Sequence, residues 1–206
     1  MDRIKYGNQS SSALDPRSSI LDPRSSILHP RSSWTSLTDP QLLAQCQVDT
    51  YRASGPGGQK RNKTSSAVRL RHAPSGLIVI AEESRSQHEN RLRALRRLRQ
   101  ALYLKIRDEL PADSLTPETL LQLNDYKEAR KANGRLDLGR KDSRFWPTVG
   151  VVLDVLAAAQ ARVSDAARIL GISTANLVDF LTVEPKVWEQ ANHLRARFGQ
   201  KPLRDD

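Results

Sequence analysis

The stretch "AVRLRHAPSGLIVIA", residues 67–81, decides the fold of the first half of this 206-residue chain. Apolar and arginine side chains alternate from Val68 to Arg71, a period of two that is typical of a half-buried strand with a basic outer face. Pro74-Ser75-Gly76 has the composition of a turn, and the apolar run Leu77 to Ala81 then returns. The stretch predicts a hairpin within a small antiparallel sheet.

The sequence on either side of the hairpin adds helices and a third strand. A short helix is expected at 41–44 and a strand around 46–52. Ser86 and Glu89 have the spacing of a capping box, so a long helix should start at Ser86 and end before Pro111. Its apolar stripe is Leu92, Leu95, Leu98, Leu102, Ile106 and Leu110. The first half therefore predicts an α+β fold in which a long basic helix lies beside a small antiparallel sheet.

The composition favours a polyanionic partner. The chain has 33 Lys and Arg against 23 Asp and Glu, a formal net charge of +10, and nucleic acid is the first candidate. Cys46 is the single cysteine and the four histidines lack metal-ligand spacing, so we expect no disulfide, metal or cofactor. No apolar run approaches the roughly 20 residues that cross a bilayer. We expect a monomer in the cytoplasm, with an organelle as the alternative.

The remaining sequence divides into segments of different character. "LDPRSSI" occurs twice and "LHPRSS" once between residues 14 and 33, and a proline in every repeat argues against a coiled coil. Thr116 and Pro117 predict a helix that runs to Gly134, followed by a basic linker. Four further helices are expected at 148–161, 164–170, 173–181 and 185–198. The expected parts are a disordered segment at 1–39, an α+β domain at 40–110, a helix and basic linker at 111–147, and an all-helical C-terminal module at 148–206.

The segment between the first two strands carries the strongest functional motif. Gly57 and Gly58 allow backbone angles that a side chain forbids and permit very close approach to another surface. Gln59 has no pKa near neutrality, but its amide and backbone N–H can orient a water molecule or donate to an oxyanion. A plain linker loop is the alternative interpretation, since Gly-Gly alone is common.

The neighbouring residues, read together, make the linker interpretation weaker. The order and spacing of Gly57-Gly58-Gln59, Asn62-Lys63-Thr64 and Arg85-Ser86-Gln87 closely resemble the catalytic domain of class I peptide chain release factors. Further matching positions are Ala67-Val68, His72, Pro74-Ser75-Gly76, Asn90-Arg91 and Ala94. The similarity runs from about Gln47 to Tyr103, so the domain expected at 40–110 is identified as a Gly-Gly-Gln catalytic domain.

The resemblance implies a ribosome-dependent peptidyl-tRNA hydrolase. In this family the loop enters the peptidyl transferase centre and promotes attack of water on the ester between the nascent peptide and transfer RNA. Gly57 and Gly58 would then supply the loop conformation, and Gln59 would place the water and donate its backbone N–H. Gln59 is also a candidate for N-methylation by a glutamine methyltransferase. Contacts to ribosomal RNA are expected from Lys60, Arg61, Asn62, Lys63, Arg69, Arg71, Arg85, Arg91, Arg96 and Arg97.

Two observations bear on which branch of the family the chain resembles. Only the repeat segment and a short run precede Gly57, so we expect codon-independent rescue of stalled ribosomes rather than stop-codon reading. Rescue factors usually end in a flexible basic tail, whereas this chain ends in an apolar helical module. The candidates to replace that tail are Arg130, Lys131, Arg135, Arg140, Lys141 and Arg144.

Two alternative functions compete with peptide release. The first is a ribosome- or RNA-binding protein that has the fold without catalysis, although the intact Gly57-Gly58-Gln59 argues against it. The second is a DNA-binding regulator, because "DAARILGISTANLVDFL", residues 165–181, has helix-turn-helix spacing. Residues 173–181 contain Asp179 and no Lys or Arg, which favours a plain packed helical pair over a helix that reads a DNA groove.

Overall fold

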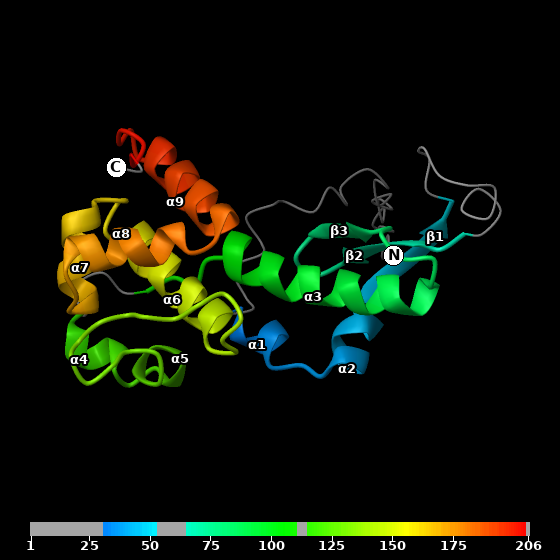
Figure 1. The fold of residues 1–206 in the computed structure, drawn as a ribbon, viewed down its shortest axis with the longest axis horizontal. Coiled ribbons are helices and arrows are strands. Elements are labelled where there is room, and N and C mark those ends of the chain that lie inside the picture. Colours follow the sequence, from blue (N-terminus) through cyan, green and yellow to red (C-terminus); the bar gives the residue numbers. More distant parts are fainter. Residues whose placement is uncertain (1–30, 53–64, 111–114, 205–206) are drawn as a thin grey trace, which may run out of the picture.

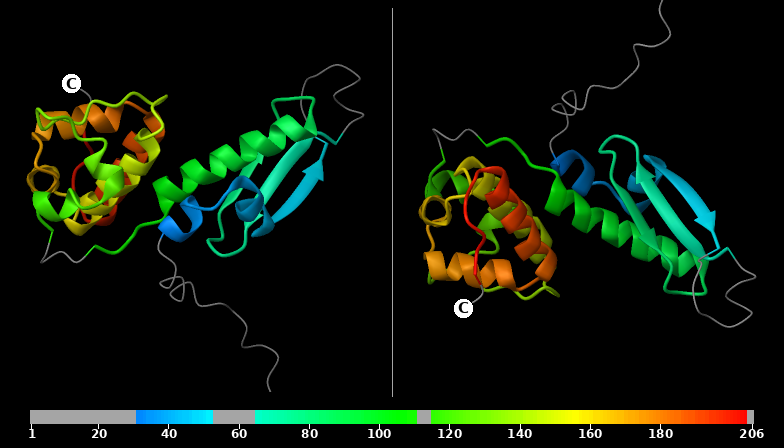
Figure 2. Two further views of the ribbon diagram at one scale, coloured as in Figure 1. Left: turned by 90° about the horizontal axis from the view of Figure 1, so that it is seen from below. Right: turned by 90° about the horizontal axis from the view of Figure 1, so that it is seen from above.

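A computed structural model describes three segments of the chain, residues 31–52, 65–110 and 115–204. Figure 1 shows a sheet module and a helical module, with the long helix α3 (Gln87–Lys105) running from one to the other. Both views of Figure 2 place the two modules at opposite ends of α3. The expected α+β class with a helical C-terminal region is confirmed.

The sheet has the predicted antiparallel hairpin at its centre. Its strands, in spatial order, are β1 (Cys46–Tyr51), β2 (Ala67–His72) and β3 (Ile78–Ala81). The turn between β2 and β3 closes through the Gly76 N–H, which donates to the His72 carbonyl at 2.9 Å. Gly76 has φ +70°, a backbone conformation that glycine adopts without the strain of a Cβ.

The inner face of β2 forms the core of the sheet module. Val68 and Leu70 are fully buried against Leu98 and Leu102 of α3, while the alternating Arg69 and Arg71 point to the other face. His72 is buried too. Its Nδ1 lies 2.7 Å from Ser75 Oγ and its Nε2 lies 3.1 Å from Gln45 Oε1, and burial lowers the pKa of its imidazole.

The N-terminal boundary differs from the prediction. Disorder was expected up to residue 39, but residues 31–39 are ordered and contain α1 (Ser32–Thr35) and the start of α2 (Asp39–Ala44). Trp34 is buried and packs edge-to-face on the His72 ring, with 5.3 Å between the ring centroids. These contacts are tertiary, so the local composition gave no indication of them.

Helix α3 begins as predicted and ends earlier. The Ser86 hydroxyl accepts a hydrogen bond from the Glu89 N–H at 3.3 Å, which confirms Ser86 as the N-cap. The helix stops at Lys105 rather than near Leu110, because the following residues leave it to meet the helical module. Leu92, expected in the apolar stripe, is 42% exposed, so the buried face of α3 is narrower than the leucine pattern indicates.

The single helix expected from Thr116 to Gly134 is two short helices, so that prediction is wrong. The Thr116 cap is present, but α4 covers only Pro117–Leu120 and α5 covers Asn124–Lys127. Leu123 between them has extended backbone (φ −80°, ψ 116°), and this break lets both Leu120 and Tyr126 reach the same core.

The helical module contains both the expected linker and the expected C-terminal helices. The longer helices lie close to the predicted ranges and are α6 (Phe145–Ala158), α7 (Val163–Leu170), α8 (Thr174–Thr182) and α9 (Pro185–Arg197). Tyr126 of α5 and the linker side chains Leu136 and Leu138 are buried and join one core with α6 to α9. Within the described segments, no helix is both long and apolar enough to cross a membrane.

Candidate functional site

The Gly-Gly-Gln motif is attached to the free end of the sheet. Gly57, Gly58 and Gln59, with Lys60, Arg61, Asn62 and Lys63, lie outside the described residues. The strands on either side are described, and the last residue of β1, Tyr51, is the register partner of the first residue of β2, Ala67. The segment that carries the motif therefore leaves and re-enters the sheet at neighbouring positions.

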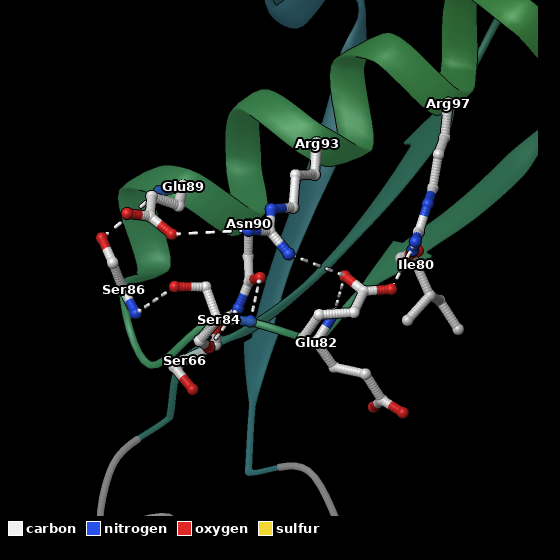
Figure 3. A network of polar contacts seen from close by, with 10 residues as sticks. Ser66, Ile80, Glu82, Ser84, Ser86, Glu89, Asn90, Arg93 and Arg97 are labelled. Atoms are coloured by element: carbon white, nitrogen blue, oxygen red, sulfur yellow. Dashed lines mark hydrogen bonds and ion pairs between the residues drawn. The ribbon is translucent and has the colours of Figure 1, made fainter.

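A buried asparagine lies directly beside the point of re-entry. Asn90 in the first turns of α3 is fully buried, and its Nδ2 donates to the carbonyls of Ser66 at 2.7 Å and Ser84 at 2.8 Å. Its Oδ1 accepts from the Ser84 N–H at 3.0 Å. Figure 3 shows Asn90 between these two chain segments. One neutral side chain thus joins the start of β2, the β3–α3 connection and α3 itself.

The connection between β3 and α3 is held by further short-range contacts. The Ser86 N–H donates to Ser84 Oγ at 3.0 Å, and Ser86 in turn caps α3. Arg97 donates to both the Ile80 carbonyl and the Glu83 carboxylate, and Figure 3 shows Arg97 reaching Ile80. The hydrogen bond from Arg97 is the main cause that lowers the pKa of Glu83.

The arginines predicted to contact RNA fall into two groups. Arg69 is paired with Asp49 at 2.8 Å and Arg97 with Glu83, so any phosphate would compete with a carboxylate of the protein for these two side chains. The other predicted arginines that the structure describes have no acidic partner among the described residues, and they are Arg71, Arg85, Arg91 and Arg96. The second group is therefore better placed to meet a polyanion.

A cluster of buried charges joins the two modules. Arg31 of the N-terminal segment is only 5% exposed and contacts Asp108 at 3.3 Å and Asp154 of α6 at 2.8 Å. Arg107, just beyond α3, contacts the same Asp154 at 3.0 Å. Burial raises the pKa of Asp154 to about 6, against the opposing effect of the two arginines, and burial lowers the pKa of Arg107 to about 10. We call these four residues the junction cluster.

Gly150 of α6 makes room for the junction cluster. A Cβ built on Gly150 would lie 2.7 Å from Arg31 Cζ and 2.9 Å from Nη2, closer than side-chain carbons are found to other atoms. The absence of a side chain at Gly150 therefore allows the Arg31 guanidinium to reach Asp154, one turn further along the same helix.

The segment with helix-turn-helix spacing does form a helical pair. Helices α7 and α8 meet at Gly171, which has φ +66°. However, residues 133–138 of the linker lie over the start of α8: the buried Asn176 accepts from the Leu136 N–H and donates to the Leu136 carbonyl, both at 2.8 Å. Arg135 also pairs with Asp179 at 3.7 Å. This cover argues against insertion of α8 into a DNA groove.

Most of the basic residues considered as a substitute for a basic tail have partners in the helical module. Arg130 donates to the Gly171 carbonyl at 2.9 Å, Lys131 pairs with Asp137, and Arg144 pairs with Asp142 at 2.7 Å. Of these six residues, Arg140 and Lys141, both exposed, have neither an ion pair nor a side-chain hydrogen bond to a described residue. Nearby carboxylates therefore neutralise part of the positive charge that the sequence of this patch indicates.

Sequence reasoning did not anticipate the roles of Asn90, Asn176 or the junction cluster. For Asn90 a signal exists, because it lies four residues before the buried Ala94 and eight before the buried Leu98, on the apolar face of α3. A polar residue on such a face needs hydrogen-bond partners, and here the backbone supplies them. Arg31 has no comparable signal, since both of its acidic partners, Asp108 and Asp154, are 77 or more residues away in the sequence.

Comparisons with known proteins match the part of the chain that contains this site. Residues 43–138 match the family model described as the RF-1 domain. The chain is 58% identical over 60 residues to peptide chain release factor 2 of Acidithiobacillus ferrooxidans, covering 29% of this chain and 16% of that protein. It is 35% identical over 117 residues to peptide chain release factor 1 of Salinibacter ruber, covering 52% of this chain and 33% of that protein. The chain thus spans a third or less of the length of these relatives.

Proposed function

Because its RF-1 domain places this chain in the class I peptide chain release factor family, we propose that it promotes ribosome-dependent hydrolysis of the ester bond in peptidyl-tRNA. The observation that carries the proposal is the position of the Gly57-Gly58-Gln59 motif between β1 and β2, within the matched domain. Strands in register on either side give the motif a fixed base from which to enter a site built by the ribosome.

The chemistry assigns separate tasks to the three residues of the motif. Gly57 and Gly58 give the backbone the freedom to approach RNA closely. The Gln59 amide orients the attacking water, and its backbone N–H donates to the oxygen on which negative charge develops. None of these groups acts as a general acid or base, and no cofactor takes part. The reaction therefore depends on positioning inside the ribosomal pocket.

Electrostatic binding to ribosomal RNA would hold the loop in that pocket. Lys60, Arg61 and Lys63 supply positive charge in the segment that carries the motif, where the neutral Asn62 can only donate or accept hydrogen bonds, and the four arginines without acidic partners lie on the sheet module. Neutralising phosphates with these cations releases counterions, so affinity should fall steeply as salt rises. Among the predicted contacts, Arg69 and Arg97 should contribute least because they are already paired with carboxylates.

The finer part of the proposal is that release needs no stop codon and serves stalled ribosomes. The described residues before the motif, 31–52, belong to the sheet module, where they pack against α3 and His72, and they also contact α6 through the junction cluster. We propose action as a monomer on cytoplasmic ribosomes, with an organelle as the alternative. A glutamine methyltransferase that modifies Gln59 is proposed as a second partner.

The test is release of labelled peptide from purified ribosomes stalled on messenger that lacks a stop codon. We expect release by the wild type, and a loss of about 100-fold or more in both Gly58→Ala and Gln59→Ala, the size of effect expected when a reacting group is misplaced by about 1 Å. Gly58→Ala restricts the backbone of the loop, and Gln59→Ala removes the amide that positions the water. Gly139→Ala and Gln122→Ala are matched controls, because both residues lie outside the motif in the helical module, and they should retain full activity.

Two other outcomes separate the competing functions. Release that occurs only when a stop codon occupies the A site would remove the codon-independent part of the proposal and keep the hydrolase. Intact ribosome binding with no release from any sample would favour a non-catalytic RNA-binding protein. Preferential binding to duplex DNA over ribosomes at matched salt would favour a regulator, against the covered start of α8.

A further inference from the structure

The amide of Asn90 uses both of its donor hydrogens and its carbonyl oxygen on backbone groups of other segments. Both Nδ2 hydrogens go to carbonyls, at 2.7 Å to Ser66 and 2.8 Å to Ser84, and Oδ1 accepts from the Ser84 N–H at 3.0 Å. Because one partner is an N–H and two are carbonyls, only one orientation of the amide satisfies all three. The position therefore requires a neutral side chain that both donates and accepts.

The location of Ser66 gives these bonds their significance. The register pairing of β1 with β2 ends at Tyr51 and Ala67, so Ser66 is one residue beyond the paired part of the sheet. What holds Ser66 is Asn90, through its carbonyl, in a buried position. Asn90 thus extends the fixed backbone by one residue toward the Gly-Gly-Gln motif.

Helix α3, which carries Asn90, is a rigid support. Asn90 lies in the first turns of α3, a 19-residue helix that is capped by Ser86 and packed along the sheet through Ala94, Leu98 and Leu102. A long packed helix moves as one body, so a residue tied to it keeps its place relative to the sheet. The bond to Ser66 therefore transmits the position of α3 to the chain that enters the motif.

We propose that Asn90 is a positioning residue for the catalytic motif: it fixes the base of the loop so that Gln59 reaches the ester in the productive geometry. This inference rests on the proposed function. Displacement of a reacting group by about 1 Å can cost roughly 100-fold in rate, so a loose loop base should slow the chemical step without weakening ribosome binding. The side chain itself touches no reacting atom.

The helical module supplies a matched control. Asn176 is also a buried asparagine whose amide holds a neighbouring segment by its backbone, at Leu136, with two bonds of 2.8 Å. It lies on α8, whereas β1 and β2, which flank the motif in the sequence, belong to the sheet module at the other end of α3 (Figure 1). A change of Asn to Asp at either position has the same size and removes the same donors, and it leaves a carboxylate oxygen against a backbone carbonyl.

The experiment compares wild type, Asn90→Asp and Asn176→Asp at a temperature where thermal unfolding shows all three to be folded. Release from ribosomes stalled without a stop codon is measured at increasing protein concentration, giving a maximal rate and a half-saturating concentration. Amide hydrogen exchange of residues 65–68 reports on the loop base directly. We expect Asn90→Asp to lower the maximal rate at least about tenfold with the half-saturating concentration within about twofold, and to speed exchange at 65–68.

The control decides whether the effect is local. Asn176→Asp should keep the maximal rate within about twofold of wild type, even if its melting temperature falls as far as that of Asn90→Asp. Equal losses of rate in both variants, or an unchanged rate in Asn90→Asp, would overturn the positioning role. A wild type that releases no peptide overturns the proposed function itself, whereas normal wild-type release with unaltered exchange at 65–68 in Asn90→Asp overturns the present inference alone.

Discussion

The base of the loop and the junction between the modules are both held by buried polar groups, yet one is neutral and the other is charged. At the loop base a single amide, Asn90, makes three hydrogen bonds to backbone. At the junction two arginines and two aspartates come together, and Asp154 is only 3% exposed. Losing one partner should therefore cost very different amounts, since an uncompensated buried charge is far more expensive than an unsatisfied amide.

The difference also separates two uses of arginine in a strongly basic chain. Arg31 is buried and Arg107 is half-buried, both against the buried carboxylate of Asp154, and they stabilise the architecture. The arginines near the loop are half-buried or exposed, and each has an exposed carboxylate as its partner or none. Only the second kind is available to a polyanion. The net charge of the chain therefore overestimates the number of cationic side chains that can contact RNA. Three substitutions, described from the largest expected effect to the smallest, test the division between the two kinds of arginine.

The largest effect is expected for Arg31→Met, which keeps the side-chain volume and removes the charge. Asp108 and Asp154 then lose a buried partner, and we expect the free energy of unfolding to fall by about 3–5 kcal/mol, measured by urea denaturation at pH 8. Arg168→Met is the matched control, because Arg168 is 78% exposed in its pair with Asp165 and should have almost no effect. Equal losses in both variants would contradict the distinction between the two kinds of arginine.

The loss of stability in Arg31→Met should depend on pH. Burial raises the pKa of Asp154 from 3.8 to about 6, so the folded state binds this proton more tightly than the unfolded chain, and the contribution of the group to stability falls as pH rises through that window. Arg31 lowers this pKa, as Arg107 does, while Asp108 raises it. Without Arg31 the pKa rises further, and the deficit of Arg31→Met should be smaller at pH 5 than at pH 8. A deficit that grows on acidification would refute this account.

An intermediate effect is expected for Gly150→Ala. Replacing glycine by alanine inside a helix usually stabilises by about 0.5–1 kcal/mol. Here the new Cβ would lie 2.7 Å from Arg31 Cζ, and the guanidinium is held by two carboxylates and cannot move aside cheaply. We expect a net loss of about 1–3 kcal/mol in urea denaturation. In an Arg31→Ala background the same substitution should become neutral or stabilising, and a persisting loss would show that Arg31 is not its cause.

The contrast between the regions also explains what the sequence could predict. The hairpin, the Ser86 cap and the helices from α6 to α9 depend on local patterns of alternation, capping and periodicity, and they were found close to their observed positions. Helix α1 depends on tertiary contacts of Trp34 and Arg31, and the break at Leu123 depends on a core that spans the helical module. No local pattern reports such contacts.

The candidate site divides in the same way. Gly57-Gly58-Gln59 could be recognised because its spacing with neighbouring residues resembles a family. The acidic partners of Arg69 and Arg97 could not be recognised from the sequence, because Asp49 lies on a different strand and Glu83 lies in the β3–α3 connection. Charge in a sequence indicates the class of partner, but only the structure shows which cations are already neutralised.

The smallest effect on stability is expected for Asp49→Asn, and it extends the comparison to function. The pair between Arg69 and Asp49 is 2.8 Å long but both side chains are more than 40% exposed, so its loss should cost less than about 1 kcal/mol. Arg69 is then free for phosphate, and ribosome affinity should rise, with a steeper salt dependence. Asp137→Asn releases Lys131 in the helical module and makes the same change in net charge, so it is the matched control. If both variants bind ribosomes equally well, the gain reflects net charge alone; a gain confined to Asp49→Asn would place RNA against the outer face of the sheet, beside the loop base that Asn90 holds.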